Sequence, residues 1–200
     1  MKKIYIVGYN GNMARRYRAI LDYLDISHCG EDVGHRFGRL DECQGVIITT
    51  PTNMHLWHLD QFERTGLPIL CEKPISLGVF TLPKDANIQM VNQYAFTGPW
   101  PEGVTYYNNW NTGKDGLEWD CINIIGLARG EVVVENNSPF WKCAINGKEL
   151  TLHDIDMGYI KMIEAWAKRP EPNIDYILKA HDKVRRYRDT SYDRHTGAKH

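Results

Sequence analysis

The run Cys71-Glu72-Lys73-Pro74 places a carboxylate and an ammonium group side by side, directly after the apolar stretch 67–70. Such a stretch is typical of a buried strand, and Pro74 ends the strand ladder because proline has no backbone N–H. Open α/β sheets bind ligands at the carboxyl ends of their strands. A lysine there can hydrogen-bond a ribose or a substrate hydroxyl, and desolvation lowers its pKa. We therefore predict that Lys73 is catalytic and that Glu72 and Lys73 contact a cofactor, in preference to forming a surface ion pair.

A glycine turn, Gly8-Tyr9-Asn10-Gly11-Asn12-Met13-Ala14, lies between a β-branched and aromatic run at 3–7 and an apolar helical pattern that reaches residue 24. Free amides at a helix N-terminus bind phosphate groups, and the helix dipole favours their negative charge. The first glycine interval is one residue longer than in the usual dinucleotide-binding turn, and Ala14 replaces the third glycine. The position after the first strand still favours a dinucleotide site, with contacts expected from Gly8, Asn10, Gly11, Asn12 and Met13.

Two carboxylates, Glu31 and Asp32, follow the second expected strand. An acidic residue about 20 positions after the glycines normally binds the adenosine ribose of a dinucleotide. Either carboxylate would also repel a 2′-phosphate, and no arginine follows immediately, although Arg36 and Arg39 are close. We therefore expect NAD as the cofactor, with NADP as the alternative, and the pattern leaves open which carboxylate binds.

The segment Thr50-Pro51-Thr52-Asn53-Met54-His55 follows the third expected strand. Thr52 or Asn53 can cap the helix that begins there. In addition, we count Thr50, Pro51 and Asn53 as candidates for contacts with the ribose and nicotinamide of a cofactor. His55 is also a cofactor-binding candidate, although a histidine in a first helical turn more often packs or hydrogen-bonds locally.

Elements of alternating type must position these groups. Strands expected at 3–7, 26–29, 45–50 and 67–71 alternate with helices at 13–24 and 53–65, closed at Gly66. This alternation predicts an α/β fold in which a doubly wound parallel sheet occupies residues 1–76.

A second region of different character follows residue 76. Its short expected strands, separated by Gly, Asn and Pro, predict a reduced α+β region with a small open antiparallel sheet over 77–153; they lie at 88–96, 104–110, 120–127, 131–135 and 141–152. Asn146-Gly147 indicates a two-residue hairpin turn. Helices at 154–168 and 174–188 are expected to close back on the first region over 154–190, and 191–200 reads as a flexible tail.

Composition narrows the class of protein. The 200 residues carry a formal net charge of −1 and 42% hydrophobic residues, without a run long enough for a membrane span or a signal-peptide core, so we expect a cytoplasmic protein without membrane contact. Five dispersed cysteines without a CxxC pair predict neither disulfides nor a metal site. The basic stretch after residue 179 is more typical of a solvated helix end than of a nucleic-acid site. Exposed tryptophans in a small sheet would favour a homo-oligomer; the candidates are Trp110, Trp119 and Trp141.

Three of these motifs together resemble the Gfo/Idh/MocA family of NAD(P)-dependent oxidoreductases. They are the glycine turn with its first strand, Thr50 to His55, and Cys71 to Pro74, in the family's order and approximate spacing. The resemblance covers residues 1 to 76 and is weaker in 90–96 and 154–188. It implies a Rossmann-like domain joined to an open-sheet domain, and hydride transfer between nicotinamide and a hydroxyl-bearing, sugar-like small molecule.

The chain also departs from this family. It is shorter than typical members, and the Asp-x-x-x-His element on the family's substrate face corresponds to Asp120 through Ile124. Asp120 fits the aspartate and is a catalytic candidate, whereas isoleucine cannot carry a proton. Lys73, Tyr94 or His153 could replace the missing histidine. A catalytically inactive dinucleotide-binding sensor or scaffold is therefore the alternative to a compact oxidoreductase.

Overall fold

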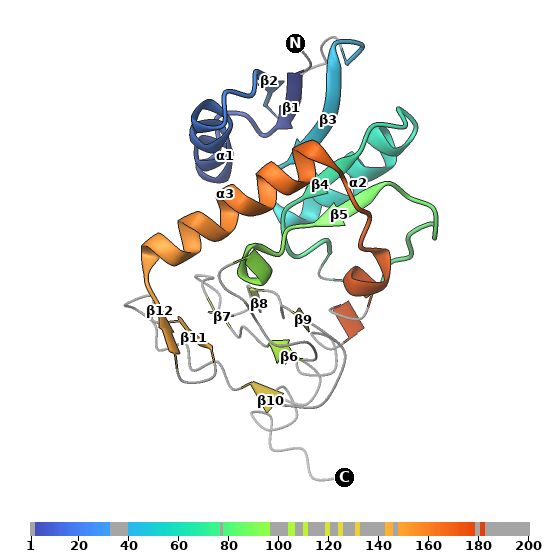
Figure 1. Cartoon of the computed structure of the whole chain (residues 1–200). Coiled ribbons are helices and arrows are strands. Elements are labelled where there is room, and N and C mark those ends of the chain that lie inside the picture. The colour runs from blue at the N-terminus through green and yellow to red at the C-terminus, as the bar shows by residue number, and fades with distance from the viewer. Residues whose placement is uncertain are drawn as a thin grey trace, which may run out of the picture.

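A five-stranded, all-parallel sheet forms the centre of the molecule (Figure 1). The computed structural model describes residues 3–32, 40–76, 78–96, 151–178 and 181–182 (backbone only at 94, 95 and 152), and the backbone of short strands between 104 and 150. In spatial order the strands are β2 (His28–Glu31), β1 (Lys3–Val7), β3 (Cys43–Ile48), β4 (Ile69–Cys71) and β5 (Ile88–Met90). The prediction of a doubly wound α/β fold is confirmed.

The strand order reverses beside β1. The chain moves from β1 to β2 on one side, then returns to place β3 on the other side, and continues outward through β4 and β5. In open α/β sheets this reversal leaves a crevice at the carboxyl ends of the two strands concerned, where ligands bind. The glycine turn follows β1, so the chain places it at the reversal.

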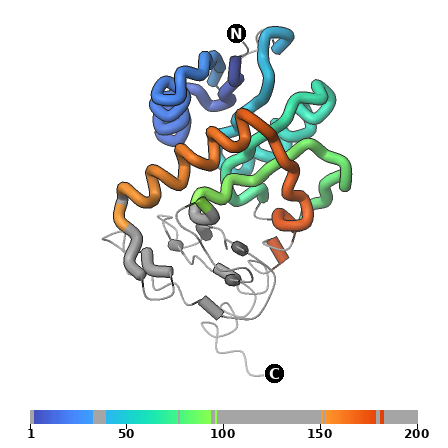
Figure 2. Tube along the Cα trace, in the orientation of Figure 1, coloured from blue at the N-terminus to red at the C-terminus, as the bar shows by residue number. Residues whose placement is uncertain are grey.

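Helices cover both faces of the sheet, because the residues of the central strands that point to either face are apolar. Ile4 and Ile6 of β1 face α1 (Asn12–Tyr23) and α3 (Leu152–Lys168). Tyr5 and Val7 lie on the opposite face with α2 (Thr52–Glu63) and a helical segment at 174–178. Figure 2 shows α3 running back across the sheet that the first 90 residues build.

α3 begins at a capping box. The Thr151 hydroxyl accepts a hydrogen bond from the Asp154 backbone N–H, and the Asp154 carboxylate accepts one from the Thr151 backbone N–H. These reciprocal bonds satisfy two amides that a helix start otherwise leaves unpaired. At the other end of α3, the Trp166 ring packs onto Gly45 of β3, where an added Cβ would lie 2.7 Å from the ring. Because Gly45 has no side chain, α3 can pack closely against β3.

Asn173 closes the edge of the sheet at β5. Its Oδ1 accepts a 2.8 Å hydrogen bond from the Met90 N–H, and its Nδ2 donates to the Met90 carbonyl at 3.2 Å. The Asn173 backbone N–H also donates to the Ile88 carbonyl. An unprotected edge strand can pair with another chain, and these bonds occupy the groups that such pairing needs.

Two details of the predicted strands are corrected. Residues 88–96 were grouped with antiparallel strands, but only Ile88–Met90 is extended, and it pairs with β4 in parallel register. Ile88 and Met90, alternate residues of β5, both pack into the core. Gln93–Phe96 forms a 3-10 helix instead of continuing the strand. β2 ends at Glu31, two residues later than predicted.

The second region contains short paired strands, seen below the sheet in Figure 1. The antiparallel pairing predicted for the strands on either side of Asn146-Gly147 is found, because Ile145 pairs with Lys148, while the two turn residues lie outside the described part of the chain. One pair departs from the predicted antiparallel arrangement, since β6 and β10 run parallel. The strands are β6 (Val104–Tyr106), β7 (Trp110–Asn111), β8 (Trp119–Asp120), β9 (Ile124–Ile125), β10 (Glu131–Val132), β11 (Cys143–Ile145) and β12 (Lys148–Leu150).

Side chains between 97 and 150 lie outside the described residues, and so do positions 33–39 and 183–200. The roles predicted for Asp120 and for the three tryptophans fall in these parts. Among the helices that the structure describes, none has the length and apolar character to span a membrane.

Candidate functional site

The glycine turn after β1 is tightly constrained. Gly8 has φ +85°, a conformation that residues with a side chain rarely adopt, and a Cβ there would lie 3.1 Å from the Thr49 hydroxyl and 3.2 Å from the Thr50 methyl group. The Gly11 N–H donates to the Gly8 carbonyl at 2.9 Å and closes the turn. No side chain of the described residues caps the start of α1 at Gly11. The first amides of α1 are therefore suited to bind an anion.

The end of β2 holds this turn in place. The Gly8 and Tyr9 amides both donate to the Glu31 carbonyl, at 2.9 and 3.2 Å. The Asp32 carboxylate accepts a 2.9 Å hydrogen bond from the Asn10 backbone N–H and another from the Asn10 side-chain amide. Asp32 and Asn10 thus fix each other.

Glu31 is placed differently from Asp32. Its Oε1 is buried and has no hydrogen-bond partner among the described residues. A buried carboxylate oxygen without a donor is costly unless a ligand or solvent supplies one. Glu31 is therefore the carboxylate with capacity to accept hydrogen bonds from a ligand at the end of β2, while Asp32 supports the turn.

The end of β3 lies against the glycine turn. The Thr49 hydroxyl donates to the Val7 carbonyl at 2.8 Å and ties β3 to β1. The next residue, Thr50, is 5% exposed, and its hydroxyl is buried without a hydrogen-bond partner in the described part of the chain. Pro51 and Asn53, at the start of α2, are exposed. This strand end therefore adds a hydroxyl to the edge of the sheet at which the carboxyl ends of the strands lie, which we call the rim.

Glu72, at the end of β4, is buried at 7% exposure. Its Oε1 accepts a 2.6 Å hydrogen bond from the Tyr17 hydroxyl, and its Oε2 accepts a 3.1 Å bond from the Lys73 backbone N–H. Burial and the nearby Glu72 charge raise the pKa of Tyr17 well above its ordinary value, so the phenol stays protonated and donates. Glu72 thus couples α1 to the Glu-Lys-Pro turn.

Lys73 follows on the same rim. Its side chain is half-buried, and its Nζ is shielded from solvent. The peptide bond between Lys73 and Pro74 is cis. The Lys73 nitrogen is thus shielded just past a strand end, and the residue before it is the buried Glu72.

The end of β5 contributes two residues that the sequence reasoning missed. Asn92 Oδ1 and Gln93 Oε1 are buried, and neither has a hydrogen-bond partner within the described ranges. The ladder pairs Cys71 with Met90, so Asn92 comes two residues after the end of β5, as Lys73 comes two residues after the end of β4. The strand-end rule that identified Lys73 would have identified Asn92 as well. The apolar residues up to Phe96 concealed it, because they extended the predicted strand past its actual end.

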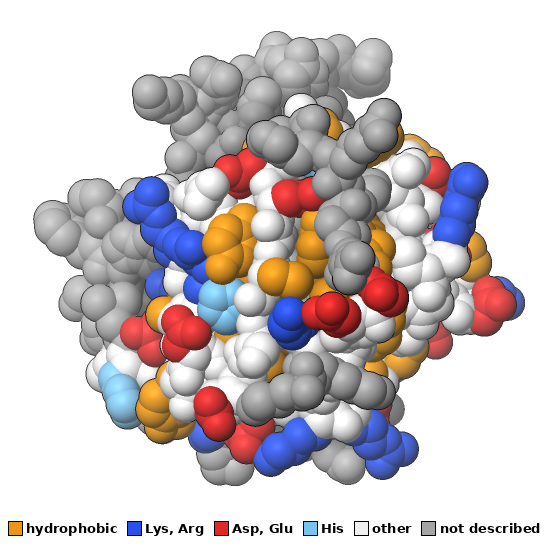
Figure 3. All heavy atoms as spheres, turned by 90° about the horizontal axis from the view of Figure 1, so that it is seen from above, with side chains coloured by type: hydrophobic (Ala, Val, Ile, Leu, Met, Phe, Trp, Pro, Cys, Tyr) orange, Lys and Arg blue, Asp and Glu red, His pale blue; other side chains and the backbone are white. Residues whose placement is uncertain are grey.

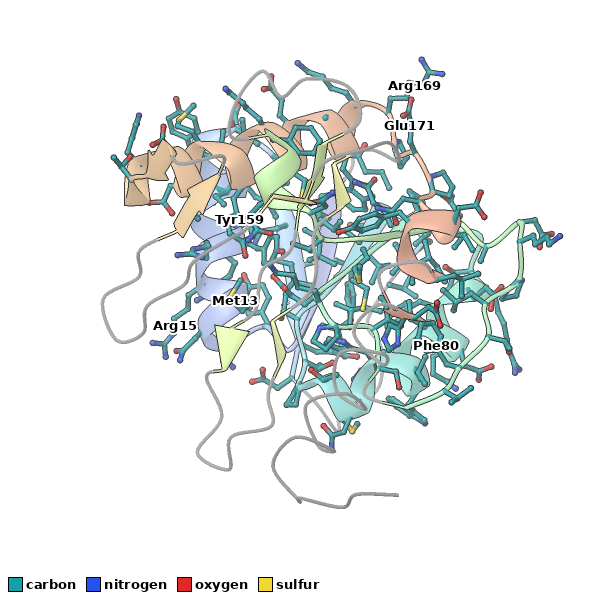
Figure 4. The ribbon with its side chains drawn as sticks, turned by 90° about the horizontal axis from the view of Figure 1, so that it is seen from below. Met13, Arg15, Phe80, Tyr159, Arg169 and Glu171 are labelled. Carbon is teal, nitrogen blue, oxygen red and sulfur yellow. The ribbon has the colours of Figure 1, made fainter. Side chains whose placement is uncertain are left out.

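The remaining predicted residues divide by position. Asn12 is exposed at the start of α1, whereas the Met13 side chain is partly buried against the core under α1 and α3. Figure 4, which views the molecule from below, shows Met13 and Arg15 on the same side as Tyr159 of α3, with Phe80 on the other side of the ribbon. The backbone amide of Met13, rather than its side chain, is therefore the group that could contact a ligand at the glycine turn.

His55 lies inside the rim. Its ring is 1% exposed, and both nitrogens contact backbone carbonyl oxygens, those of Thr50 and Pro74, at 2.7 Å each. Burial lowers the pKa of His55, while the two carbonyls act in the opposite direction. The imidazole is thus engaged by the main chain.

The face opposite to the rim is different. Figure 3, seen from above, shows acidic and basic side chains interspersed around hydrophobic ones. Lys3 and Glu42 form a 2.8 Å ion pair there, near the amino ends of β1 and β3. Among the described residues, four of the buried polar side-chain oxygens without a hydrogen-bond partner, those of Glu31, Thr50, Asn92 and Gln93, lie at or just after the carboxyl ends of β2, β3 and β5. Other such atoms lie on the helices, for example in Arg18, His58 and Trp166.

Two solved dehydrogenases resemble the structure. The fold is Rossmann-like. The WlbA (WbpB) dehydrogenase of Thermus thermophilus, solved with NAD and UDP-GlcNAcA, matches with a TM-score of 0.55 at 12% identity, over 92% of this chain and 95% of that chain. A myo-inositol dehydrogenase of Corynebacterium glutamicum matches with a TM-score of 0.53 at 13% identity, over 91% and 94%. No protein-family model and no curated protein matches the sequence.

Proposed function

We propose that the chain is a compact NAD-dependent oxidoreductase that transfers hydride between nicotinamide and a hydroxyl-bearing, sugar-like small molecule. The observation that carries this proposal is that buried polar atoms of Glu31, Thr50, Asn92 and Gln93, near strand ends along one rim of the sheet, have no hydrogen-bond partner among the described residues. The glycine turn lies at the reversal of strand order on that rim. Both features are those of a dinucleotide site in an open α/β sheet.

Each part of the rim has a place in this proposal. The amides of the glycine turn and of the first turn of α1 would bind the pyrophosphate, and Glu31 would accept hydrogen bonds from the adenosine ribose. Asn12, Thr50, Pro51 and Asn53 remain candidates for further cofactor contacts. NAD is preferred because the Glu31 carboxylate would repel a 2′-phosphate.

Lys73 is the proposed catalytic group. When bound, a nicotinamide ring supplies the acceptor or donor of hydride. Lys73, as a neutral amine, would take the proton of a substrate hydroxyl while the hydrogen on the same carbon leaves with its electron pair. Asp120 would position the substrate. This chemistry is that of the Gfo/Idh/MocA family, and the two similar dehydrogenases support it, since one was solved with NAD and the other is named for a polyol.

Titration of the purified protein with NADH, followed by quenching of tryptophan fluorescence, tests the cofactor. We expect saturable quenching that Gly8→Val abolishes, because a side chain at φ +85° would strain the turn and press on Thr49 and Thr50. Gly78→Ala is the matched control, since the nearest atom to an added Cβ is 3.9 Å away. If the wild-type protein binds neither NADH nor NADPH, the proposal is refuted.

An inactive dinucleotide-binding sensor or scaffold is the second candidate. Ile124 favours it, because the family resemblance places a proton-carrying histidine there. Oxidation of a panel of polyols, sugars and nucleotide sugars separates the two. Turnover that Lys73→Ala removes supports the enzyme, whereas NADH binding without any turnover supports the sensor.

A further inference from the structure

The His55 ring spans the ends of two adjacent strands. Its Nδ1 lies 2.7 Å from the carbonyl oxygen of Pro74, and its Nε2 lies 2.7 Å from that of Thr50. The first carbonyl belongs to the residue after Lys73, and the second belongs to Thr50, whose own hydroxyl is buried just past the end of β3. The ring is 1% exposed, so these contacts are shielded from water.

The sequence places a proline just past the end of each of these two strands. The ladder between β3 and β4 ends with the bond from the Glu72 N–H to the Ile48 carbonyl. Beyond it, Pro51 and Pro74 have no N–H to donate. Past Glu72, the His55 ring contacts the main-chain segments on both sides of this gap; it donates to one of the two carbonyls when neutral and to both when protonated.

We propose that His55 is a positioning residue that fixes the Lys73-Pro74 turn relative to Thr50, and so sets the nicotinamide side of the site. The proposal rests on the proposed dinucleotide-binding function. It assigns His55 no contact with the cofactor. The glycine turn is held by other groups, the Glu31 carbonyl and Asp32, so the adenosine side does not depend on the imidazole.

Two probes distinguish the halves of the site. ADP-ribose has the adenosine, the pyrophosphate and a ribose but lacks the nicotinamide ring, whereas NADH has all of these. In His55→Ala we expect the Kd for NADH to rise about tenfold, which corresponds to one or two lost contacts. We expect the Kd for ADP-ribose to stay within about twofold.

The neighbouring histidine provides the control. His58 is on the same helix and is also 1% exposed, but neither of its nitrogens has a hydrogen-bond partner in the described part of the chain. His58→Leu removes a buried imidazole without removing a bridge, so both Kd values should stay near those of the wild type. Imidazole added to His55→Ala should lower the Kd for NADH by filling the vacated space, and it should leave wild-type affinity unchanged.

A second variant covers the case in which His55→Ala does not fold. His55→Gln keeps an amide that can donate to one of the two carbonyls, and we expect an intermediate rise in the Kd for NADH. Equal weakening of both probes, or no change in either, would overturn the positioning role. If the wild type binds neither probe, the proposed function itself fails, and the positioning role fails with it.

Discussion

At the scale of single residues, the buried Glu72 carboxylate has the most demanding surroundings. It is 7% exposed and accepts hydrogen bonds from the Tyr17 hydroxyl and the Lys73 amide. A buried charge is stable only when donors replace the water it has lost. The Tyr17 hydroxyl is thus part of what allows a carboxylate at this position.

Tyr17→Phe tests that dependence. We expect the free energy of unfolding to fall by about 1–3 kcal/mol, because one oxygen of a buried carboxylate loses its donor while the aromatic ring stays. Urea denaturation measures the change. Tyr23→Phe is the matched control, because Tyr23 is 73% exposed, and it should leave stability unchanged. Equal stability of the two variants would show that Glu72 does not need the phenol.

A second residue-scale prediction concerns the choice of cofactor. Glu31→Ser should weaken NADH binding about tenfold, which is about 1.4 kcal/mol, and should narrow the preference for NADH over NADPH, because it removes both an acceptor and a repelling charge. Asp32→Asn tests the neighbouring carboxylate, which binds Asn10. It should weaken both nucleotides alike, because it loosens the turn. Fluorescence titrations with the two nucleotides measure these effects.

The sequence could indicate this pair of carboxylates but not their separate roles. Position along the chain brings both to the end of β2. Which one bonds to Asn10 depends on the direction of each side chain, and that direction follows from the turn's three-dimensional path. Asn92 and Gln93 were missed for a related reason, since the point at which β5 ends is set by tertiary contacts of Met90 with Asn173.

At the scale of elements, hydrophobic periodicity predicted the parallel sheet and its covering helices well. Buried central strands read as apolar runs, and α1 and α3 carry apolar stripes at helical spacing. The second region was harder to predict. Its strands are two or three residues long, too short for a period-2 pattern to determine register, and the Asn146-Gly147 turn fixed one pair.

The close packing of α3 against Gly45 of β3 leads to a prediction at the scale of elements. Gly45→Ala should destabilise the fold by about 1–3 kcal/mol, because the new methyl group would lie 2.7 Å from the Trp166 ring and 3.2 Å from the Pro68 carbonyl oxygen. Urea denaturation followed by far-UV circular dichroism measures it. Gly78→Ala should change stability by no more than about 0.5 kcal/mol. A tolerated Gly45→Ala would show that α3 can shift on the sheet.

At the scale of the whole molecule, two buried histidines, His55 and His58, and the half-buried His181 make stability depend on pH. Burial lowers the pKa of His58 to about 4 and also lowers those of His55 and His181. The His181 Nε2 accepts a hydrogen bond from the Ser76 N–H, which holds the C-terminal helical segment against the Glu-Lys-Pro side of the sheet. The unfolded chain takes up more protons than the folded chain below pH 6.5. Stability therefore falls as the pH drops from about 6.5 toward 4.

His58→Leu isolates the largest of these contributions. The wild type should lose on the order of 3 kcal/mol more than the variant between pH 7 and pH 4, because the variant has no imidazole to protonate at that position. His55 and His181 remain in both proteins, so the difference reports the protonation of His58 together with its electrostatic interaction with His55. Denaturant titrations at a series of pH values measure the difference. Parallel pH profiles would show that His58 is not buried in the neutral form.

Because hydrogen bonding at the carboxyl ends of the strands is incomplete, the stability of the folded state should respond to small molecules that bind there. Glu31, Thr50, Asn92 and Gln93 each have a buried side-chain oxygen without a hydrogen-bond partner in the part of the chain that the structure describes. A compound that supplies matching donors binds the native state alone, so the melting temperature rises with its concentration. At a hundredfold excess over Kd, the free energy of unfolding increases by about 2.7 kcal/mol. Thermal melting across a library of metabolites would therefore reveal the natural substrate without any prior assay of turnover.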